Sequence, residues 1–230
     1  PKQSRVGGRP ETIRYPATRM GVMESIRTAF LAAQDYRRDW DAYEALPPSE
    51  RQRTAPPRRD LQLEAIAEIL SGERSIHCHA YRQDEMLAIL RLTEDFGIGV
   101  TTFEHGLEGY KIADELAASG AGVTTFADWW AYKMEAYDAI PHNAALMTER
   151  GVLVSVNSDS GEEMRHLNQE AAKTIKWGGL SEVEAHEPAS PLRSPRREPT
   201  RHRSRGACTD RCQYDARRKR WRRRRPDKLA

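Results

Sequence analysis

Apolar residues recur along this chain with two different periods, and the period changes at regular intervals. At 22–39 and 61–70 they return every three or four positions, as on one face of an amphipathic helix. From residue 75 onward, short β-branched runs alternate with further stretches of that helical period. The pattern predicts strands near residues 76, 100, 123 and 154 and helices at 83–96, 107–118, 143–149 and 162–175.

This alternation of strand and helix is typical of βα units. The predicted strands follow one another at intervals of roughly 23 to 31 residues, which leaves room for one crossover helix between successive strands. The sequence therefore predicts an α/β fold with a parallel sheet or part of a barrel.

The remaining segments divide the chain into three parts. Residues 1–74 form a helical and loop segment, in which a Pro- and Arg-rich stretch at 46–57 is predicted to be a solvated connection. Residues 75–185 carry the βα units, including a helical piece expected at 129–137. Residues 186–230 are rich in Arg, Ser and Pro and show no apolar period, so we expect them to be disordered.

The net charge of the chain changes sign at residue 186. The segment 186–230 holds 16 Lys+Arg against 5 Asp+Glu, a net charge of +11, whereas residues 1–185 hold 21 against 29, a net charge of −8. Eight of the nine residues at 217–225 are basic, and such a run binds phosphate strongly and without sequence preference. A protein that binds nucleic acid non-specifically through this tail is therefore the alternative function.

Membrane insertion and a disulfide framework find no support in the sequence. The mean hydropathy is −0.78, and no run of about 18 apolar residues occurs. With three cysteines, two of them in the basic tail, we expect Cys78 to be a reduced thiol. The chain opens on Pro1-Lys2 without the apolar core of a signal peptide; we expect its true start to be missing, which leaves its location open, with the cytoplasm as the default.

Histidine and aspartate side chains that could act in catalysis lie at the predicted carboxyl ends of the strands. His77 and His79 stand two residues apart in one strand and should share a face of the sheet. His105 follows the next strand and Asp159 follows the strand near residue 154. Catalytic groups of βα folds sit at this edge of the sheet.

Imidazole and carboxylate side chains are the ligands of a hydrolytic zinc ion, which lowers the pKa of its bound water toward about 7. An aspartate beside that water can accept its proton. A single histidine at a strand end is more often a hydrogen-bonded core residue, but the three histidines together with Asp159 favour a metal site.

The segments Ile76-His77-Cys78-His79-Ala80, Phe103-Glu104-His105-Gly106 and Val156-Asn157-Ser158-Asp159-Ser160 follow in this order on successive βα units. This arrangement resembles the amidohydrolase superfamily, nearest its imidazolonepropionase-like and prolidase-like members.

The resemblance implies a distorted TIM barrel that binds one or two divalent metal ions, zinc first, and hydrolyses carbon–nitrogen bonds of a small-molecule substrate. It implies that His77 or His79 is the ligand from strand five, with His77 favoured. It further implies that His105 is the ligand from strand six and that Asp159 is the carboxylate from strand eight that binds metal and moves protons.

Two departures from that family change the expectation. The early His-x-His pair and the Lys or Glu after strand four are absent from this sequence, and the C-terminal part loses its apolar period after Glu184-Ala185. Translation in a shifted frame would produce such a loss, and a genuine basic tail is the competing interpretation. We therefore expect a partial TIM barrel of roughly strands five to eight that is inactive alone and that self-associates through its open sheet edges.

Four further residues are candidate substrate contacts. Arg19 could meet a substrate carboxylate, and Trp129 could line a pocket, although aromatic residues at helical spacing are more often core. Glu163 and Arg165 lie just beyond Asp159 and could orient it or the substrate, although a solvated first helical turn explains them equally well.

Overall fold

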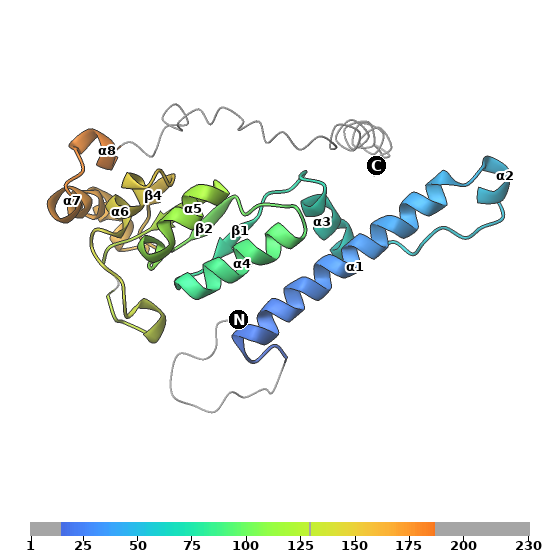
Figure 1. The fold of residues 1–230 in the computed structure, drawn as a ribbon, viewed down its shortest axis with the longest axis horizontal. Helices are drawn as coiled ribbons and strands as arrows, with labels where there is room; N and C mark the ends of the chain where they lie inside the picture. The colour runs from blue at the N-terminus through green and yellow to red at the C-terminus, as the bar shows by residue number, and fades with distance from the viewer. Residues whose placement is uncertain (1–14, 129, 187–230) are drawn as a thin grey trace. The chain divides into compact units, whose positions relative to one another are not determined.

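Four parallel strands lie at the centre of the fold in the computed structural model, which describes residues 15–128 and 130–186 (Figure 1). The strands are β1 (His77–His79), β2 (Thr102–Glu104), β3 (Gly122–Thr125) and β4 (Val154–Val156). They pair in chain order, β1-β2-β3-β4, and every pair is parallel. The predicted α/β class with a parallel sheet is therefore confirmed.

The two faces of this sheet differ in character. Phe103, Val123 and Val154 are in register on neighbouring strands and therefore share one face of the sheet. All three are buried in the main hydrophobic core. Between them, Glu104 and Thr124 point to the opposite face and are only partly buried. One face thus carries the core, and the other face is polar.

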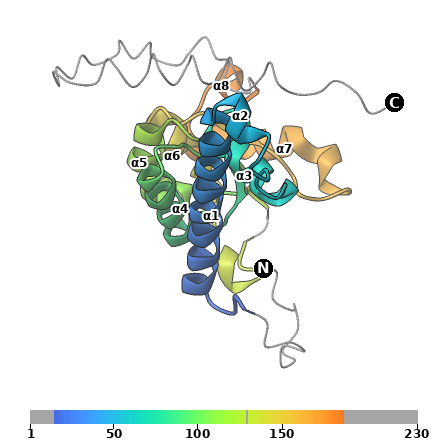
Figure 2. The same ribbon diagram turned by 90° about the vertical axis from the view of Figure 1, so that its right-hand side faces the viewer.

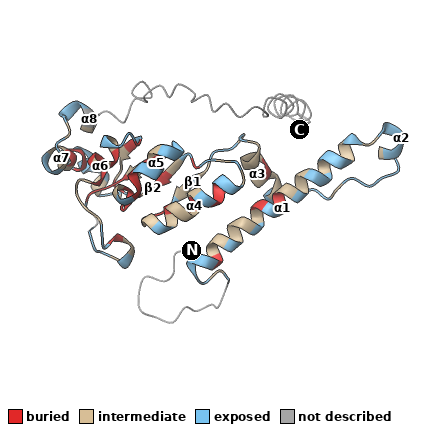
Figure 3. Ribbon diagram, in the orientation of Figure 1, coloured by how far each residue is buried: buried red, intermediate tan, exposed pale blue. Residues whose placement is uncertain are grey.

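Helices that connect the strands supply the rest of the core. They are α4 (Gln83–Asp95), the 3₁₀ helix η1 (Gly109–Ile112) with α5 (Ala113–Ser119), and α6 (Asn143–Glu149). Met86, Leu116 and Met147, one from each of these connections, are fully buried in the cluster that contains Phe103 and Val123. Buried residues accordingly gather around β2, α4, α5 and α6 (Figure 3).

The long helix α1 (Arg19–Ala45) precedes the sheet and packs against α3 (Leu61–Leu70), which lies beside it in Figure 2. Thr18 caps α1 by accepting a hydrogen bond from the backbone N–H of Gly21 at 3.1 Å. The ring of Phe30 meets Phe96, at the end of α4, with centroids 5.1 Å apart. These contacts attach the N-terminal helices to the βα units.

The last described part of the chain is the 3₁₀ helix η3 (Glu163–His166), followed by α7 (Leu167–Gly178) and α8 (Glu182–His186). A side chain at Gly178 would overlap the methyl group of Ala145, so glycine permits the close approach of α7 to α6. Gly179 then ends α7 with a left-handed φ of 74°.

Most predicted helices lie where the apolar period placed them. The bounds of α3 and α6 match the predictions for 61–70 and 143–149, and α4 ends one residue before the predicted 83–96. The prediction of a helical piece at 129–137 was wrong in extent: of the described residues 130–137, only those of the 3₁₀ helix η2 (Met134–Ala136) are helical. Aromatic residues in that segment imitate a helical period without forming a helix.

The connection predicted at 46–57 also differs, because it contains the one-turn helix α2 (Pro48–Arg51). Pro48 stands at the first helical position, where a missing N–H costs nothing. Trp129 and residues 187–230, nearly all of the expected basic tail, lie outside the described residues. Within the described residues, no helix is long and apolar enough to cross a membrane.

Candidate active site at the carboxyl edge of the sheet

The carboxyl ends of the four strands meet at one edge of the sheet. His79, the last residue of β1, is in register with Glu104, the last residue of β2, and Thr125 is in register with Val156 at the ends of β3 and β4. His105 follows β2 directly, and Asp159 follows β4 after two residues. The parallel register therefore brings the predicted site residues of three strands to the same edge.

An aromatic cluster holds His79 and His105 together. Their ring centroids are 4.6 Å apart, with the rings nearly perpendicular. Tyr81 stacks on His105 at 5.6 Å with an angle of 19° between the ring planes, and Phe126 lies 5.4 Å from His105 on a tilted ring. Because the His105 side chain is only 14% exposed, its orientation is set by this packing.

Asp159 meets His105 from the neighbouring part of the edge. Its Oδ1 lies 3.9 Å from Nε2 of His105, and its side chain is 46% exposed. Both residues have left-handed backbones, with φ of 69° at His105 and 48° at Asp159. Only Ala131 shares this feature among the non-glycine residues that the structure describes. Such conformations cost about 1–3 kcal/mol each and often occur at functional sites.

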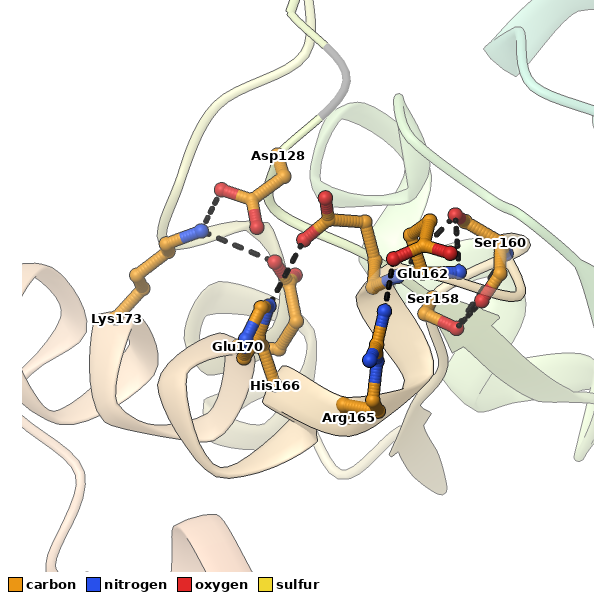
Figure 4. A network of polar contacts seen from close by, with 9 residues as sticks. Asp128, Ser158, Ser160, Glu162, Arg165, His166, Glu170 and Lys173 are labelled. Carbon is orange, nitrogen blue, oxygen red and sulfur yellow. Dashed lines mark hydrogen bonds and ion pairs between the residues drawn. The ribbon is translucent and has the colours of Figure 1, made fainter.

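Serine hydroxyls shape the turn that carries Asp159. Ser158 Oγ donates to the carbonyl of Ser160 at 3.1 Å, and Ser160 Oγ accepts the backbone N–H groups of Glu162 and Glu163, both at 3.2 Å (Figure 4). The hydroxyl of Ser160 thereby serves the first turn of η3 as a helix cap would. Asp159 is thus fixed between the end of β4 and a locally bonded helix start.

His77 has a different environment from His79. Its Nδ1 lies 3.3 Å from Oε1 of Glu104, and its side chain is 58% exposed. The Thr124 hydroxyl donates to Oε2 of Glu104 at 2.6 Å, and this bond lowers the pKa of Glu104, with smaller contributions from His77 and His105. The structure thus brings His79, His105 and Asp159 together, whereas His77 pairs with Glu104.

Glu104 and Tyr81 were missed by the sequence analysis. Glu104 could have been found from the strand period, since it stands two residues beyond Thr102, the register partner of His77. Tyr81 is likewise two residues beyond His79, on the same strand parity, although β1 ends before it. Tyr81 is not a usual metal ligand, whereas Glu104 is a carboxylate that was passed over because it lies within β2 rather than after it.

The proposed substrate contacts are not gathered at this edge by any contact that the structure gives. Arg19 Nε binds Oε1 of Glu85, in the first turn of α4, at 2.6 Å. Glu163 Oε2 lies 3.6 Å from Nδ1 of His166, and Arg165 pairs with Glu162 (Figure 4). The pairs of Glu163 and Arg165 are local to the exposed start of η3, whereas the pair of Arg19 joins α1 to α4. Trp129 lies outside the described residues.

A buried polar network lies beside the edge, between β3 and α7. Glu170 is 1% exposed and accepts the backbone N–H of Ala127, and Lys173 Nζ lies 3.0 Å from its Oε1 (Figure 4). Lys173 also pairs with Asp128. Burial raises the pKa of Glu170 and lowers the pKa of Lys173. This network ties the segment after β3 to α7.

The cavity beside this network is too small for a substrate. It measures about 10 Å³ and is lined by Phe126, Pro141, Asn143 and Glu170, among others. That volume accommodates about one water molecule. This cavity is therefore not a substrate site.

The donors present fit part of a metal site. The neutral imidazole of His105 and the carboxylate of Asp159 have the chemistry that zinc prefers, at a separation that one ion can bridge. Across residues 15–128 and 130–186, however, no group of three or more His, Cys, Asp or Glu side chains is arranged to hold an ion. The described residues supply converging donors without a full coordination shell.

Two known proteins are similar to this chain, whereas no family model matches it. Amidohydrolase tasK from Hapsidospora irregularis is 27% identical over 172 residues, which cover 71% of this chain and 17% of that protein. The crystal structure of an amidohydrolase from Thermotoga maritima MSB8 superimposes with a TM-score of 0.66 and 25% identity, over 75% of this chain and 43% of that one. The chain thus spans less than half the length of either relative.

Proposed function

We propose that this chain belongs to the amidohydrolase superfamily and contributes to a metal-dependent hydrolase of carbon–nitrogen bonds, because two amidohydrolases are similar to it and the solved structure of one shares its fold over 75% of this chain. The similarity to these two amidohydrolases supports a hydrolase of this family. The metal, the bond that is cleaved and the residues that act on it are our proposal.

The observation that carries the proposal is the approach of His105 Nε2 to Asp159 Oδ1 at 3.9 Å, with the ring of His79 beside His105. Three groups able to bind a divalent ion thereby lie near one another, without surrounding a single point, at the strand edge where βα enzymes place their chemistry. We include His77 in the donor set, since it shares the strand and the face of His79.

Each residue has a distinct role in this proposal. His77, His79, His105 and Asp159 would hold a divalent ion, zinc first, which when bound polarises the substrate carbonyl and acidifies water. The carboxylate of Asp159, half exposed at the edge, accepts a proton from the attacking water and passes it to the leaving nitrogen as the carbon–nitrogen bond breaks. The aromatic packing of His105 keeps that histidine in place beside it.

Since no three donors are arranged around one point in the described residues, we propose that this chain alone binds zinc weakly and hydrolyses little. Titrating metal-free protein with Zn²⁺ by calorimetry tests this. We expect one weak site whose affinity falls at least about tenfold in His105→Asn and in Asp159→Asn, because each change removes a donor.

His166→Asn is the matched control, because His166 is an exposed histidine paired with Glu163 on η3. Its zinc affinity should equal that of the unmodified chain. Equal affinity in all three variants would contradict the proposed site. Stoichiometric, tightly held zinc after purification without chelator would contradict the weak binding expected of this chain alone.

The second proposal concerns the basic segment at 186–230, nearly all of which lies outside the described residues. Its net charge of +11 favours non-specific binding of nucleic acid. Deleting residues 186–230 should abolish DNA binding measured at two salt concentrations. Binding that survives the deletion would assign the affinity to the acidic remainder of the chain instead.

A further inference from the structure

A row of hydrogen bonds crosses β1, β2 and β3 and reaches the end of β4, on the sheet face away from the core. Asn157 Nδ2 donates to Oγ1 of Thr124 at 2.8 Å, and Thr124 Oγ1 donates to Oε2 of Glu104 at 2.6 Å. Glu104 Oε1 then lies 3.3 Å from Nδ1 of His77. The row therefore joins residues that are 80 positions apart in the sequence.

The direction of every bond in this row follows from Thr124. Its Oγ1 accepts the amide hydrogen of Asn157 and, at 3.2 Å, the backbone N–H of His105. A hydroxyl has one hydrogen and two lone pairs, so both lone pairs are used and its hydrogen must go to Glu104. The carboxylate of Glu104 is an acceptor only, and Nδ1 of His77 must therefore carry a hydrogen and donate it.

We propose that Glu104 is a positioning residue that holds the neutral imidazole of His77 in the tautomer protonated at Nδ1 and so keeps the lone pair of Nε2 available for a divalent metal ion. The metal part of this proposal rests on the proposed function. Metal-binding histidines commonly donate their second ring N–H to a carboxylate or carbonyl, which fixes the tautomer and orients the ring.

Packing alone does not account for this arrangement. His77 is more than half exposed, and a neutral imidazole in water favours the tautomer protonated at Nε2, the opposite of the one that Glu104 selects. The bond to Glu104 therefore fixes a tautomer that solvent alone would not favour. The hydrogen bonds of Thr124 and Asn157 orient the carboxylate that makes this bond.

The tautomer can be measured directly, without metal and without activity. The chain contains seven histidines, so a long-range ¹H–¹⁵N correlation spectrum of histidine-labelled protein is simple enough to assign, with His77→Gln identifying the signals of His77. At a pH where His77 is neutral, we expect the proton on Nδ1. A proton on Nε2 in the unmodified chain would overturn the proposal.

Glu104→Gln provides an isosteric switch. The Thr124 hydrogen still needs an acceptor, so the amide oxygen turns toward Thr124 and the NH₂ group turns toward His77, making Nδ1 the acceptor. We expect His77 to change to the Nε2–H tautomer in this variant, while Glu149→Gln, an exposed change on α6, leaves it unaltered. An unchanged tautomer in Glu104→Gln would overturn the role of Glu104.

Titration with Zn²⁺ distinguishes the tautomer set by Glu104 from metal binding by His77. If Nε2 of His77 binds the ion, Glu104→Gln should weaken zinc binding by about 10- to 100-fold relative to Glu149→Gln. If the tautomer switches but His77→Gln binds Zn²⁺ as tightly as the unmodified chain, then His77 is not a ligand. That result refutes the metal part of the proposal and removes His77 from the proposed function, while the positioning by Glu104 stands.

Discussion

Asn143 links three elements of the fold through a single buried side chain. Its Nδ2 donates to the carbonyl of Gly106, after β2, and to Oγ1 of Thr125, in β3, each at 2.9 Å. Its Oδ1 accepts the backbone N–H of Tyr110, in η1, at 2.9 Å. Since an amide has two donor hydrogens and an acceptor oxygen, one residue satisfies three groups that water does not reach.

Replacing this side chain should be costly. We expect Asn143→Leu to lower the free energy of unfolding by about 2–4 kcal/mol, because the backbone N–H of Tyr110 loses its acceptor and the hydroxyl of Thr125 and the carbonyl of Gly106 each lose a buried donor. Urea denaturation followed by circular dichroism measures the change. Asn168→Ala, an exposed change on α7, should stay within about 0.5 kcal/mol of the unmodified chain. A loss below 1 kcal/mol in Asn143→Leu would show that the bonds are not needed.

Cys78 allows a test of burial at the level of one atom. Burial raises the pKa of its thiol to about 11, with a smaller contribution from Glu85, so the thiolate is rare at neutral pH. Alkylation by iodoacetamide, followed peptide by peptide with mass spectrometry, should therefore accelerate about tenfold per pH unit up to pH 10. In urea the rate should level off near pH 9, as for an ordinary thiol. A native rate that levels off at that same pH would contradict the raised pKa.

At the scale of elements, α7 is attached to the segment after β3 by charges rather than by apolar packing alone. Lys173 stands between Asp128 and the almost fully buried Glu170 (Figure 4). Removing one member of a buried ion pair leaves the other charge without compensation, whereas removing both often costs little. The network therefore predicts strong coupling between the two positions.

We expect Lys173→Met to lower the free energy of unfolding by about 2–3 kcal/mol and the double change Glu170→Gln/Lys173→Met to recover at least half of that loss. Thermal or urea unfolding of the single and double variants gives the coupling energy. Lys176→Met, on the same helix, controls for the loss of a lysine. Additive losses at positions 170 and 173 would mean that the two side chains act independently.

The sequence predicted the helices of this fold better than its strands. Helix 61–70 could be placed from its clean apolar period, and the structure adds that Asp60 caps it by accepting the backbone N–H groups of Gln62 and Leu63. The strands are only three or four residues long, too short for a period of two to define their ends. The prediction for 129–137 failed because its aromatic residues stand at a spacing that suggested a buried helical face. In the structure, Trp130, Tyr132 and Tyr137 are largely exposed.

The position of the candidate residues at one edge of the sheet was predictable from the sequence, but their pairings were not. Strand ends located His77, His79, His105 and Asp159, because parallel strands finish at one edge. Which histidine faces which partner depends on register and on the left-handed turns at His105 and Asp159, and neither follows from local sequence. Glu104 acquires its meaning only through Thr124, which lies 20 residues further along the chain.

At the scale of the described molecule, the sheet has two outer strands. Within the described residues, β1 pairs with β2 alone and β4 pairs with β3 alone. Unpaired strand edges are templates for pairing with another chain. Self-association through these edges therefore remains our proposal, and it has a direct test.

We expect the chain to associate increasingly with concentration, as measured by sedimentation velocity. Leu153→Lys should reduce association, because it places a charge immediately before β4 at a side chain that is already largely exposed. Met134→Lys, at an exposed apolar residue on η2, is the matched control. If Met134→Lys reduces association as much as Leu153→Lys, exposed apolar surface rather than the strand edge drives it.

The spatial order of the strands is also the order in which a ribosome makes them. Each new βα unit joins the edge left by the one before it, so no strand has to wait for a partner on its far side. Assembly during synthesis can thus advance one unit at a time, with β1 and β2 already docked while β4 is still in the exit tunnel. A stalled nascent chain in which β3 has left the exit tunnel and β4 has not should accordingly protect β1 to β3 from protease.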